Sequence, residues 1–330
     1  MTRNQAAAPA PHRQGTRRRR DWPLAGGLIA GVIADAIAGD PARGHPVALF
    51  GQLMIAAEQR IYDDRTGSGI AYTTGGIIVG TWPLLVAARA TGTSPAGRAA
   101  VTAVTAWAAI ASRSLCGAAR QIATALSAGD LAQAREALPC LCGRDPQQLD
   151  NAGITRAVVE SVAENTSDAI VAPLVWGALA GPAGVSGYRA VNTMDAMVGH
   201  HSPRYERFGR ASARVDDVAN WIPARVTALL AAACSPAVGG KPAPTWQTAR
   251  DYGPRHPSPN AGWCEAAFAG ALGVQLGGVL SYSGRTEHRP EIGTGRAPAP
   301  GDIARAIRLS RAVTATATAL AAAVAAAARG

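Results

Sequence analysis

Seven apolar segments, each about long enough to cross or enter a lipid bilayer, constrain the fold of this chain more than any other feature. They lie at roughly 23–39, 70–90, 99–118, 169–188, 223–239, 264–282 and 309–328. A spanning helix needs about 20 mainly apolar residues, and most of these segments are interrupted by Gly, Pro or Arg, so we expect about four to six true spans. The alternative interpretation is the buried helical bundle of a soluble protein.

The composition favours the membrane interpretation. Only 16% of the residues are charged, whereas about 25% is usual for soluble domains. We find no alternation typical of a β-strand and no internal repeat. The sequence therefore predicts an all-α, polytopic membrane helical bundle that forms a single domain over 21–330, with a loop over 283–303 and a C-terminal helix over 304–330.

Residues 1–20 form a basic, Pro-containing arm that we expect to be disordered. The chain has a net charge of +10, and Arg3, Arg13 and Arg17–Arg20 supply part of it just before the first apolar segment. Under the positive-inside rule this arrangement places the N-terminus in the cytoplasm and the chain in the cell membrane. Because no basic stripe is interleaved with aromatic residues, nucleic acid is not expected as a partner.

Segment 169–188 is interrupted by two prolines and several glycines, which predicts a broken or re-entrant element. Such an element keeps the polar stretches on either side of it on the same face of the membrane. Amphipathic helices are expected over 113–139, with a stop and a new N-cap at Ser127–Asp130, and another helix over 146–165.

The edge of this segment carries three acids at intervals of four residues: Glu160, Glu164 and Asp168. On a continuous helix they share one face, and no lysine on that face offsets their repulsion. Mg²⁺ takes oxygen ligands and is commonly shared with substrate phosphates, so we interpret the three acids as a magnesium site. The alternative is an ordinary acidic surface.

Residues 188–225 combine acids, amides and arginines. Asn192 with Asp195, and Asp217 with Asn220, are each three residues apart, which places a carboxylate beside an amide on one helical face. Arginines in the same stretch suit bidentate anion binding. Residues 256–273 add a stiff turn at Pro257 and Pro259, after which Asn260 is expected to cap a helix that buries a lone acid, Glu265. His45-Pro46 forms a similar polar corner.

These stretches resemble the CobD/CbiB family, the adenosylcobinamide(-phosphate) synthases of cobalamin biosynthesis. The resemblance covers about 39–282 and is carried by GDPARGHPVALFG (39–51), GDLAQAREAL (129–138), GRD (143–145), ESVAENTSDAIVAPLVW (160–176), YRAVNTMDAMVG (188–199), RYERFGRASARVDDVANWIPAR (204–225) and HPSPNAGWCEAAFAGALG (256–273). Cys142, Pro146 and His201 depart from the family pattern.

The resemblance implies a membrane ligase that forms a carbon–nitrogen bond. It would join a carboxylate of adenosylcobyric acid to (R)-1-amino-2-propanol or its O-phosphate, with Mg²⁺ and ATP, at a site facing the cytoplasm. The implied catalytic residues are Asp216, Asp217, Glu265 and His256. The implied substrate-binding residues are Arg189, Asn192, Arg204, Tyr205, Asn220, Arg225, Asn260 and His45. The implied metal ligands are Glu160, Glu164, Asp168 and Asp195.

Two other functions fit a polytopic protein with polar membrane residues. A secondary transporter would explain broken helices and acids at membrane depth, but it predicts inverted repeats, which we do not find. A membrane scaffold for other late enzymes of the corrinoid pathway would predict that changes in the polar motifs leave product formation intact.

Overall fold

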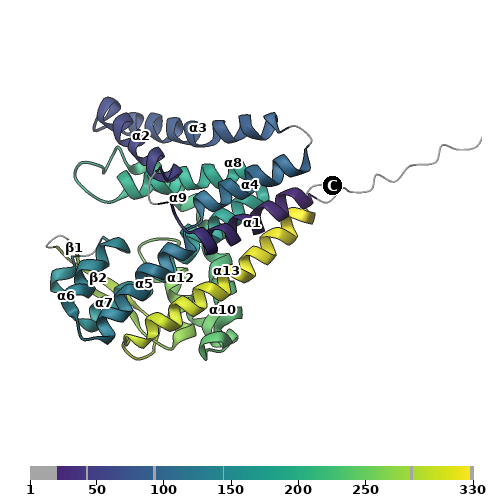
Figure 1. Cartoon of the computed structure of the whole chain (residues 1–330). Helices are drawn as coiled ribbons and strands as arrows, with labels where there is room; N and C mark the ends of the chain where they lie inside the picture. Colours follow the sequence, from purple (N-terminus) through teal and green to yellow (C-terminus); the bar gives the residue numbers. More distant parts are fainter. Residues whose placement is uncertain (1–20, 42–43, 92–93, 144, 283–284, 328–330) are drawn as a thin grey trace, which may run out of the picture.

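The computed structural model describes residues 21–41, 44–91, 94–143, 145–282 and 285–327. Its described part is almost entirely helical (Figure 1), which confirms the predicted all-α membrane bundle. The predicted disordered arm, residues 1–20, lies outside the described residues. Helical stretches long and apolar enough to cross a membrane are Thr66–Ala90, Pro95–Ser127, Asn151–Gly199, Trp221–Val238 and Gly301–Ala327.

The helices at the start of the chain form a layer with an apolar outer surface. They are α1 (Trp22–Ala38), α2 (Pro46–Ile61), α3 (Thr66–Ala90) and α4 (Pro95–Ala109). Large apolar side chains on α1, α2 and α3 are exposed, including Ile33, Ile37, Leu49, Ile70, Ile78 and Trp82. A surface of this kind is stable against lipid tails rather than water, so we interpret this layer as lipid-facing.

Helices α1 and α4 run in parallel, which fixes the two ends of this layer. At one end Arg98 pairs with Asp21, at the start of both helices. At the other end the indole of Trp107 donates to the carbonyl of Gly39 at 3.0 Å. The two helices therefore start at one end of the layer and finish at the other. These two ends serve as reference points for placing the other helices.

The predicted broken element is a helical hairpin. Helix α7 (Asn151–Thr166) continues through a π-turn (Ser167–Val171) into α8 (Ala172–Met194), where Gly181 leaves helical geometry at φ 67° and Pro182 follows. In one straight helix Asp168 and Arg189 would be about 31 Å apart. They instead interact electrostatically, so the chain folds back at Gly181 and brings both flanks together.

The two arms of this hairpin pack closely, and its tip reaches the start of α1. A Cβ at Gly184 would overlap the carbonyl of Trp176 on the opposite arm. At the tip, a Cβ at Gly181 would lie 4.0 Å from Leu24 Cδ1. The polar flanks of the hairpin and the start of α1 therefore lie at opposite ends of the bundle.

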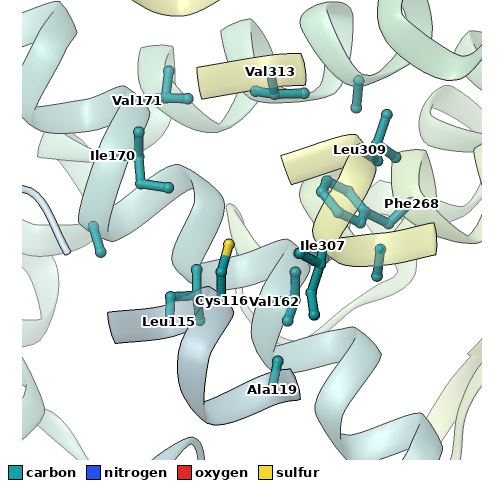
Figure 2. Close-up of a cluster of buried hydrophobic side chains, with 14 of the residues drawn as sticks. Leu115, Cys116, Ala119, Val162, Ile170, Val171, Phe268, Ile307, Leu309 and Val313 are labelled. Carbon is teal, nitrogen blue, oxygen red and sulfur yellow. The ribbon is translucent and has the colours of Figure 1, made fainter. Parts of the chain in front are cut away.

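The remaining helices surround the polar flanks of the hairpin. They are α5 (Ser112–Ser127), α6 (Leu131–Ala137), α9 (Arg210–Ala219), α10 (Trp221–Cys234), α11 (Pro242–Tyr252), α12 (Ala261–Leu272) and α13 (Gly301–Ala327), with a second π-turn at Asp195–Gly199. Short 3₁₀ turns at Leu138–Cys140, Pro146–Gln148, Ser235–Val238 and Gly253–Arg255 connect them. Figure 2 shows their shared core, in which Leu115, Val162, Phe268 and Ile307 converge from α5, α7, α12 and α13.

The amphipathic helices after the first spans are confirmed. Helix α5 ends at Ser127, and the carboxylate of Asp130 accepts a hydrogen bond from the backbone of Gln133 at 2.9 Å, which caps α6 as expected. Helix α7 begins later than predicted, at Asn151, because Pro146 starts a separate 3₁₀ turn and Asp150 caps the helix.

Three predictions for the region after residue 260 were wrong. Helix α12 has only 12 residues, so 264–282 is no membrane span. An antiparallel hairpin, β1 (Leu276–Tyr282) and β2 (Arg285–Ile292), follows where no strand and a loop over 283–303 were expected. Helix α13 already begins at Gly301. Glycines at the start of β1 and the irregular register there mask the alternation by which a strand is recognised.

Candidate functional site

The folded hairpin brings together a largely buried group of polar residues that we call the hairpin cluster: Asp168, Tyr188, Arg189, Asn192, Asp216 and Asn220. Hydrogen bonds join all of them except Asp168 into one network. The Tyr188 hydroxyl donates to Asn220 Oδ1 at 2.9 Å, and Asn220 Nδ2 donates to Asp216 Oδ2 at 2.9 Å. From the other side Arg189 Nη1 donates to Asn192 Oδ1, and Asn192 Nδ2 donates to Asp216 Oδ1, both at 3.3 Å. Asp216 is therefore the shared acceptor of two amides.

The environment of Asp216 makes its carboxylate unusually basic. Burial raises the pKa of Asp216 to about 7, and the negative charge of Asp195 adds to the effect. Hydrogen bonds from Asn220 and Asn192 act in the opposite direction because they stabilise the charged form. A carboxylate with a pKa near neutrality suits proton transfer at physiological pH.

The other acids of the hairpin flanks surround this network. Asp168 interacts electrostatically with Asp216, Glu164 and Asp195, and with the cation of Arg189. Asp217 is half-buried, and burial raises its pKa. From the sequence, Asn192 was paired with Asp195 and Asn220 with Asp217. The structure instead directs both amides to Asp216. Asn192 reaches it from the end of α8, and Asn220 reaches it from four residues further along the chain, at the end of α9.

A second group of titratable side chains lines a polar cavity of about 300 Å³. We call it the cavity cluster: Glu160, Glu164, His256, Glu265 and Arg289. Four of these residues were predicted from the sequence, although the sequence placed two of them in a metal site and two among the catalytic residues. The structure brings all four together from α7, α12 and the turn that precedes α12.

His256 is held rigidly between the turn and helix α12. Its Nδ1 accepts a hydrogen bond from the backbone of Ser258 at 3.0 Å. Its Nε2 faces Glu265 Oε1 at 3.8 Å and Arg289 Nη1 at 3.3 Å, and the His256 and Glu265 side chains are only 4% and 3% exposed. An imidazole beside a buried carboxylate can accept and pass on a proton.

Glu164 and Cys264 join the two clusters. Glu164 lines the cavity and also interacts electrostatically with Asp168 and Asp195 of the hairpin flanks. Burial raises the pKa of the Cys264 thiol well above its usual value, and the charges of Asp168, Glu164 and Glu265 add to this. The acids therefore form one continuous polar region rather than two separate sites.

The three acids at intervals of four do not form a metal cage. Across the residues that the structure describes, no three His, Cys, Asp or Glu side chains come together as a metal-binding group. Glu160 Oε1 instead accepts a hydrogen bond from the backbone of Gly277 at 2.7 Å. Asp168 sits on the π-turn beside the hairpin network, whereas Glu160 lines the cavity. The role of the three acids in metal binding stays a prediction.

Two predicted substrate-binding residues, Arg204 and Tyr205, instead bind Glu58 of helix α2. Nε and Nη2 of Arg204 donate to Glu58 Oε1 at 3.2 and 3.0 Å, and the guanidinium lies 4.0 Å from the ring centroid of Tyr62. The Tyr205 hydroxyl donates to the same Glu58 oxygen at 2.9 Å. These contacts satisfy Arg204 and Tyr205 within the fold, so the structure does not bring them to either cluster.

Arg225 and Asn260 brace α9 and α10 against α12. Arg225 Nη1 donates to Asn260 Oδ1 at 2.8 Å, and Asn260 Nδ2 donates to the backbone carbonyl of Asp217 at 2.8 Å. Asn260 therefore does not cap α12 with its side chain. The hydroxyl of Ser258 does so instead, because it accepts from the backbone of Asn260 and of Ala261.

His45 lies near the hairpin cluster but acts on the backbone. Its Nδ1 accepts a hydrogen bond from Val47 at 3.2 Å and caps α2, and its Nε2 faces Asp40 at 3.5 Å. Asp40 in turn interacts electrostatically with Arg189. The predicted polar corner is thus present, but His45 contacts Asp40 and not the hydrogen-bond network itself.

Tyr188, Glu58 and Arg289 were not predicted from the sequence as site residues. Tyr188 and Arg289 belong to the two clusters, whereas Glu58 holds Arg204. Arg289 was missed because it lies in a segment interpreted as a loop. The pair Gly277-Gly278 between apolar residues was the available sign of an irregular strand start.

These residues have the chemistry that a magnesium–nucleotide complex requires. Mg²⁺ in such sites is commonly held by one or two carboxylates together with phosphate oxygens rather than by a full protein cage. Glu160 and Glu164 supply carboxylates on one wall of the cavity, and Arg289 supplies a cation on another. The donor set therefore fits a metal that arrives with its substrate.

The fold and the site together define a multi-pass helical membrane protein with an acid- and arginine-rich site on a re-entrant hairpin. A family model described as CobD/Cbib protein matches residues 28–310. The chain belongs to this family, whose role lies in cobalamin biosynthesis and therefore involves corrinoids.

Curated relatives carry the same description, cobalamin biosynthesis protein CobD. The protein of Mycobacterium tuberculosis is 49% identical over 289 residues, which cover 88% of this chain and 92% of the relative. That of Rhodobacter capsulatus is 49% identical over 209 residues (63% and 65%), and that of Chromobacterium violaceum is 39% identical over 287 residues (86% and 90%). No solved structure matches the chain significantly.

Proposed function

We propose that this protein is an ATP-dependent amide synthase that joins a carboxylate of adenosylcobyric acid to (R)-1-amino-2-propanol or its O-phosphate. The family supports the corrinoid substrate. The observation that carries the proposal is the junction of the two clusters at Glu164, where carboxylates, arginines and an imidazole lie in one polar region.

Amide formation from a carboxylate needs activation and a free amine. A carboxylate oxygen of the corrinoid attacks the γ-phosphorus of ATP, which gives an acyl phosphate and ADP. The amine nitrogen then attacks the acyl carbon and inorganic phosphate leaves. The amine arrives protonated, so a base must take its proton. Asp216, with its pKa near 7, and the His256–Glu265 pair are the bases in this scheme.

The two clusters take different parts of this reaction. In the cavity cluster Glu160 and Glu164 would hold Mg²⁺ with the phosphates of ATP, and the metal would supply positive charge to neutralise the charge that develops in phosphoryl transfer. In the hairpin cluster the acids attract the ammonium group, and Arg189 offers a buried Nε that has no hydrogen-bond partner among the described residues. That donor suits the phosphate of a phosphorylated amine.

The size of the cavity limits what enters it. At about 300 Å³ it is far smaller than a corrin macrocycle, so only the reacting side arm of the corrinoid reaches the cavity cluster. Because ATP is supplied in the cytoplasm, the polar end of the bundle faces the cytoplasm in this proposal. The start of α1 then lies toward the opposite side of the membrane.

The test is direct synthesis by detergent-purified protein. The protein is incubated with adenosylcobyric acid, Mg-ATP and each amine separately, and mass spectrometry of the corrinoid identifies the amide. We expect one amine to be added with release of phosphate. An unchanged corrinoid in every reaction would contradict the synthase and favour a transporter or a scaffold, because neither of those consumes the corrinoid.

A further inference from the structure

Two arginines from separate elements meet at the glycine pair that opens β1. Gly278 lies opposite Arg289 in the antiparallel register of the β-hairpin. A Cβ at Gly278 would lie only 3.2 Å from Arg156 Nη1, on helix α7. Gly277 and Gly278 both have positive φ angles, 77° and 85°, which only glycine adopts readily. The glycines thus permit Arg156 to approach the backbone of the turn.

Arg156 holds a donor that the described part of the protein does not use. Its Nε is buried and has no hydrogen-bond partner among the described residues. A buried donor without an acceptor is destabilising, and native proteins rarely keep one without a function. Arginine presents its donors as a planar fork that matches phosphate oxygens. The orphaned Nε therefore points to an anionic ligand at this turn.

The side chains near Arg156 indicate which class of anion could bind there. One helical turn further along α7, Glu160 accepts the backbone hydrogen of Gly277 and lines the cavity with Glu164 and Arg289. These carboxylates repel a bare anion. They favour an anion that arrives with a divalent cation, because the cation bridges carboxylate and phosphate oxygens.

We propose that the turn at Gly277-Gly278, with Arg156 and Arg289, binds the triphosphate of Mg-ATP beside the cavity. This inference rests on the function proposed above and specifies where the phosphates of the nucleotide bind. Both arginines bind phosphate oxygens, and the glutamates of α7 face the metal. A corrinoid carboxylate shares the same anion chemistry and is the competing ligand, so the test must separate the two.

Equilibrium dialysis of the full-length, detergent-purified protein, with each probe added alone, provides that test. The probes are a non-hydrolysable ATP analogue with Mg²⁺, the same analogue with EDTA, adenosine, and adenosylcobyric acid. We expect Arg156→Gln and Arg289→Gln each to weaken binding of the Mg²⁺-bound analogue by about tenfold to a hundredfold. Adenosine binding should not change, which a merely structural role would not predict. Arg250→Gln, at an exposed position on α11, is the matched control.

A second substitution at Arg156 covers the case in which the first variant does not fold, and four outcomes decide between the two proposals. If Arg156→Gln does not fold, Arg156→Lys keeps the charge without the fork and should weaken binding less. Wild-type affinity in both glutamine variants would overturn the proposal, as would a change that affects adenosylcobyric acid but not the analogue. If the variants lose nucleotide while the wild type forms no amide, the nucleotide site stands and the proposed function fails. If the wild type forms the amide while both variants bind the analogue with normal affinity, the proposed function stands and the nucleotide site is rejected.

Discussion

The hairpin cluster and the cavity cluster are both acidic, but they hold their acids differently. In the hairpin cluster two amides donate to Asp216, and Tyr188 and Arg189 complete the network. The cavity cluster surrounds open space and takes its residues from α7, α12, β2 and the turn before α12. The first is an interior network and the second a binding space. In our proposal the hairpin cluster therefore binds the small amine, whereas the cavity cluster holds magnesium with the phosphates of ATP.

Glu164→Gln should have the largest effect because Glu164 belongs to the boundary of both clusters. Loss of a carboxylate that faces a bound metal removes several kcal/mol of transition-state stabilisation, so turnover should fall by about 10³-fold. The amide substitution preserves shape, so the thermal transition should stay near that of the wild type. Glu206→Gln, at an exposed position, is the control. Retained turnover would remove Glu164 from the site.

Gly184→Ala tests whether the hairpin cluster depends on the close packing of the two arms of α8. The added methyl group would overlap the carbonyl of Trp176, so we expect a loss of about 1–3 kcal/mol in the free energy of unfolding. Activity should fall with it, because the flanks that form the cluster separate. Gly75→Ala, where a Cβ meets no atom within 4 Å, should be tolerated. Equal thermal stability of the two variants would argue against the folded-back geometry.

Arg189→Gln should separate the two amines. If Arg189 binds the phosphate of the amine substrate, KM for aminopropanol phosphate should rise by about tenfold to a hundredfold. The reaction of the free amino alcohol should be affected much less, which also reports that the variant is folded. Steady-state kinetics with both amines measure the split. An equal loss with both would show that Arg189 only positions Asn192 and Asp216.

Arg204→Gln should have the smallest effect on chemistry. It removes the bond to Glu58 and the stacking on Tyr62, which tie the loop before α9 to α2. We therefore expect a lower melting temperature and an unchanged kcat for the folded protein. A selective fall in kcat at constant stability would return Arg204 to the reaction.

Much of the fold could be predicted from the sequence because apolar length and breaking residues act locally. The break in 169–188 follows from Gly181 and Pro182, and the cap at Asp130 follows from its position after Gly129. The β-hairpin could not be predicted in the same way. Its first strand begins with two glycines, which carry no side-chain pattern.

The residue types of the site were predictable, but their partners were not. Glu265 was found because a lone acid is rare in an apolar helix, and Glu160 and Glu164 because acids at intervals of four repel one another. His256 was found only through the family resemblance. Which amide meets Asp216, and that Arg204 is taken by Glu58, depends on contacts between residues far apart in the sequence. Spacing along one helix cannot report such contacts, so the partner of Asn192 was not predicted.

The account depends most on the hairpin, which must return the chain to the side from which it entered. Impermeant maleimide labelling of single cysteines in oriented membrane vesicles measures this directly, in a protein whose native cysteines are replaced. Exposed positions Gln147 and His201 flank the hairpin, and Ala96 lies at the end of the bundle near its tip. We predict that cysteines at 147 and 201 react from one face and a cysteine at 96 from the other. Reaction of 147 and 201 from opposite faces would contradict the folded-back hairpin and the joined site built on it.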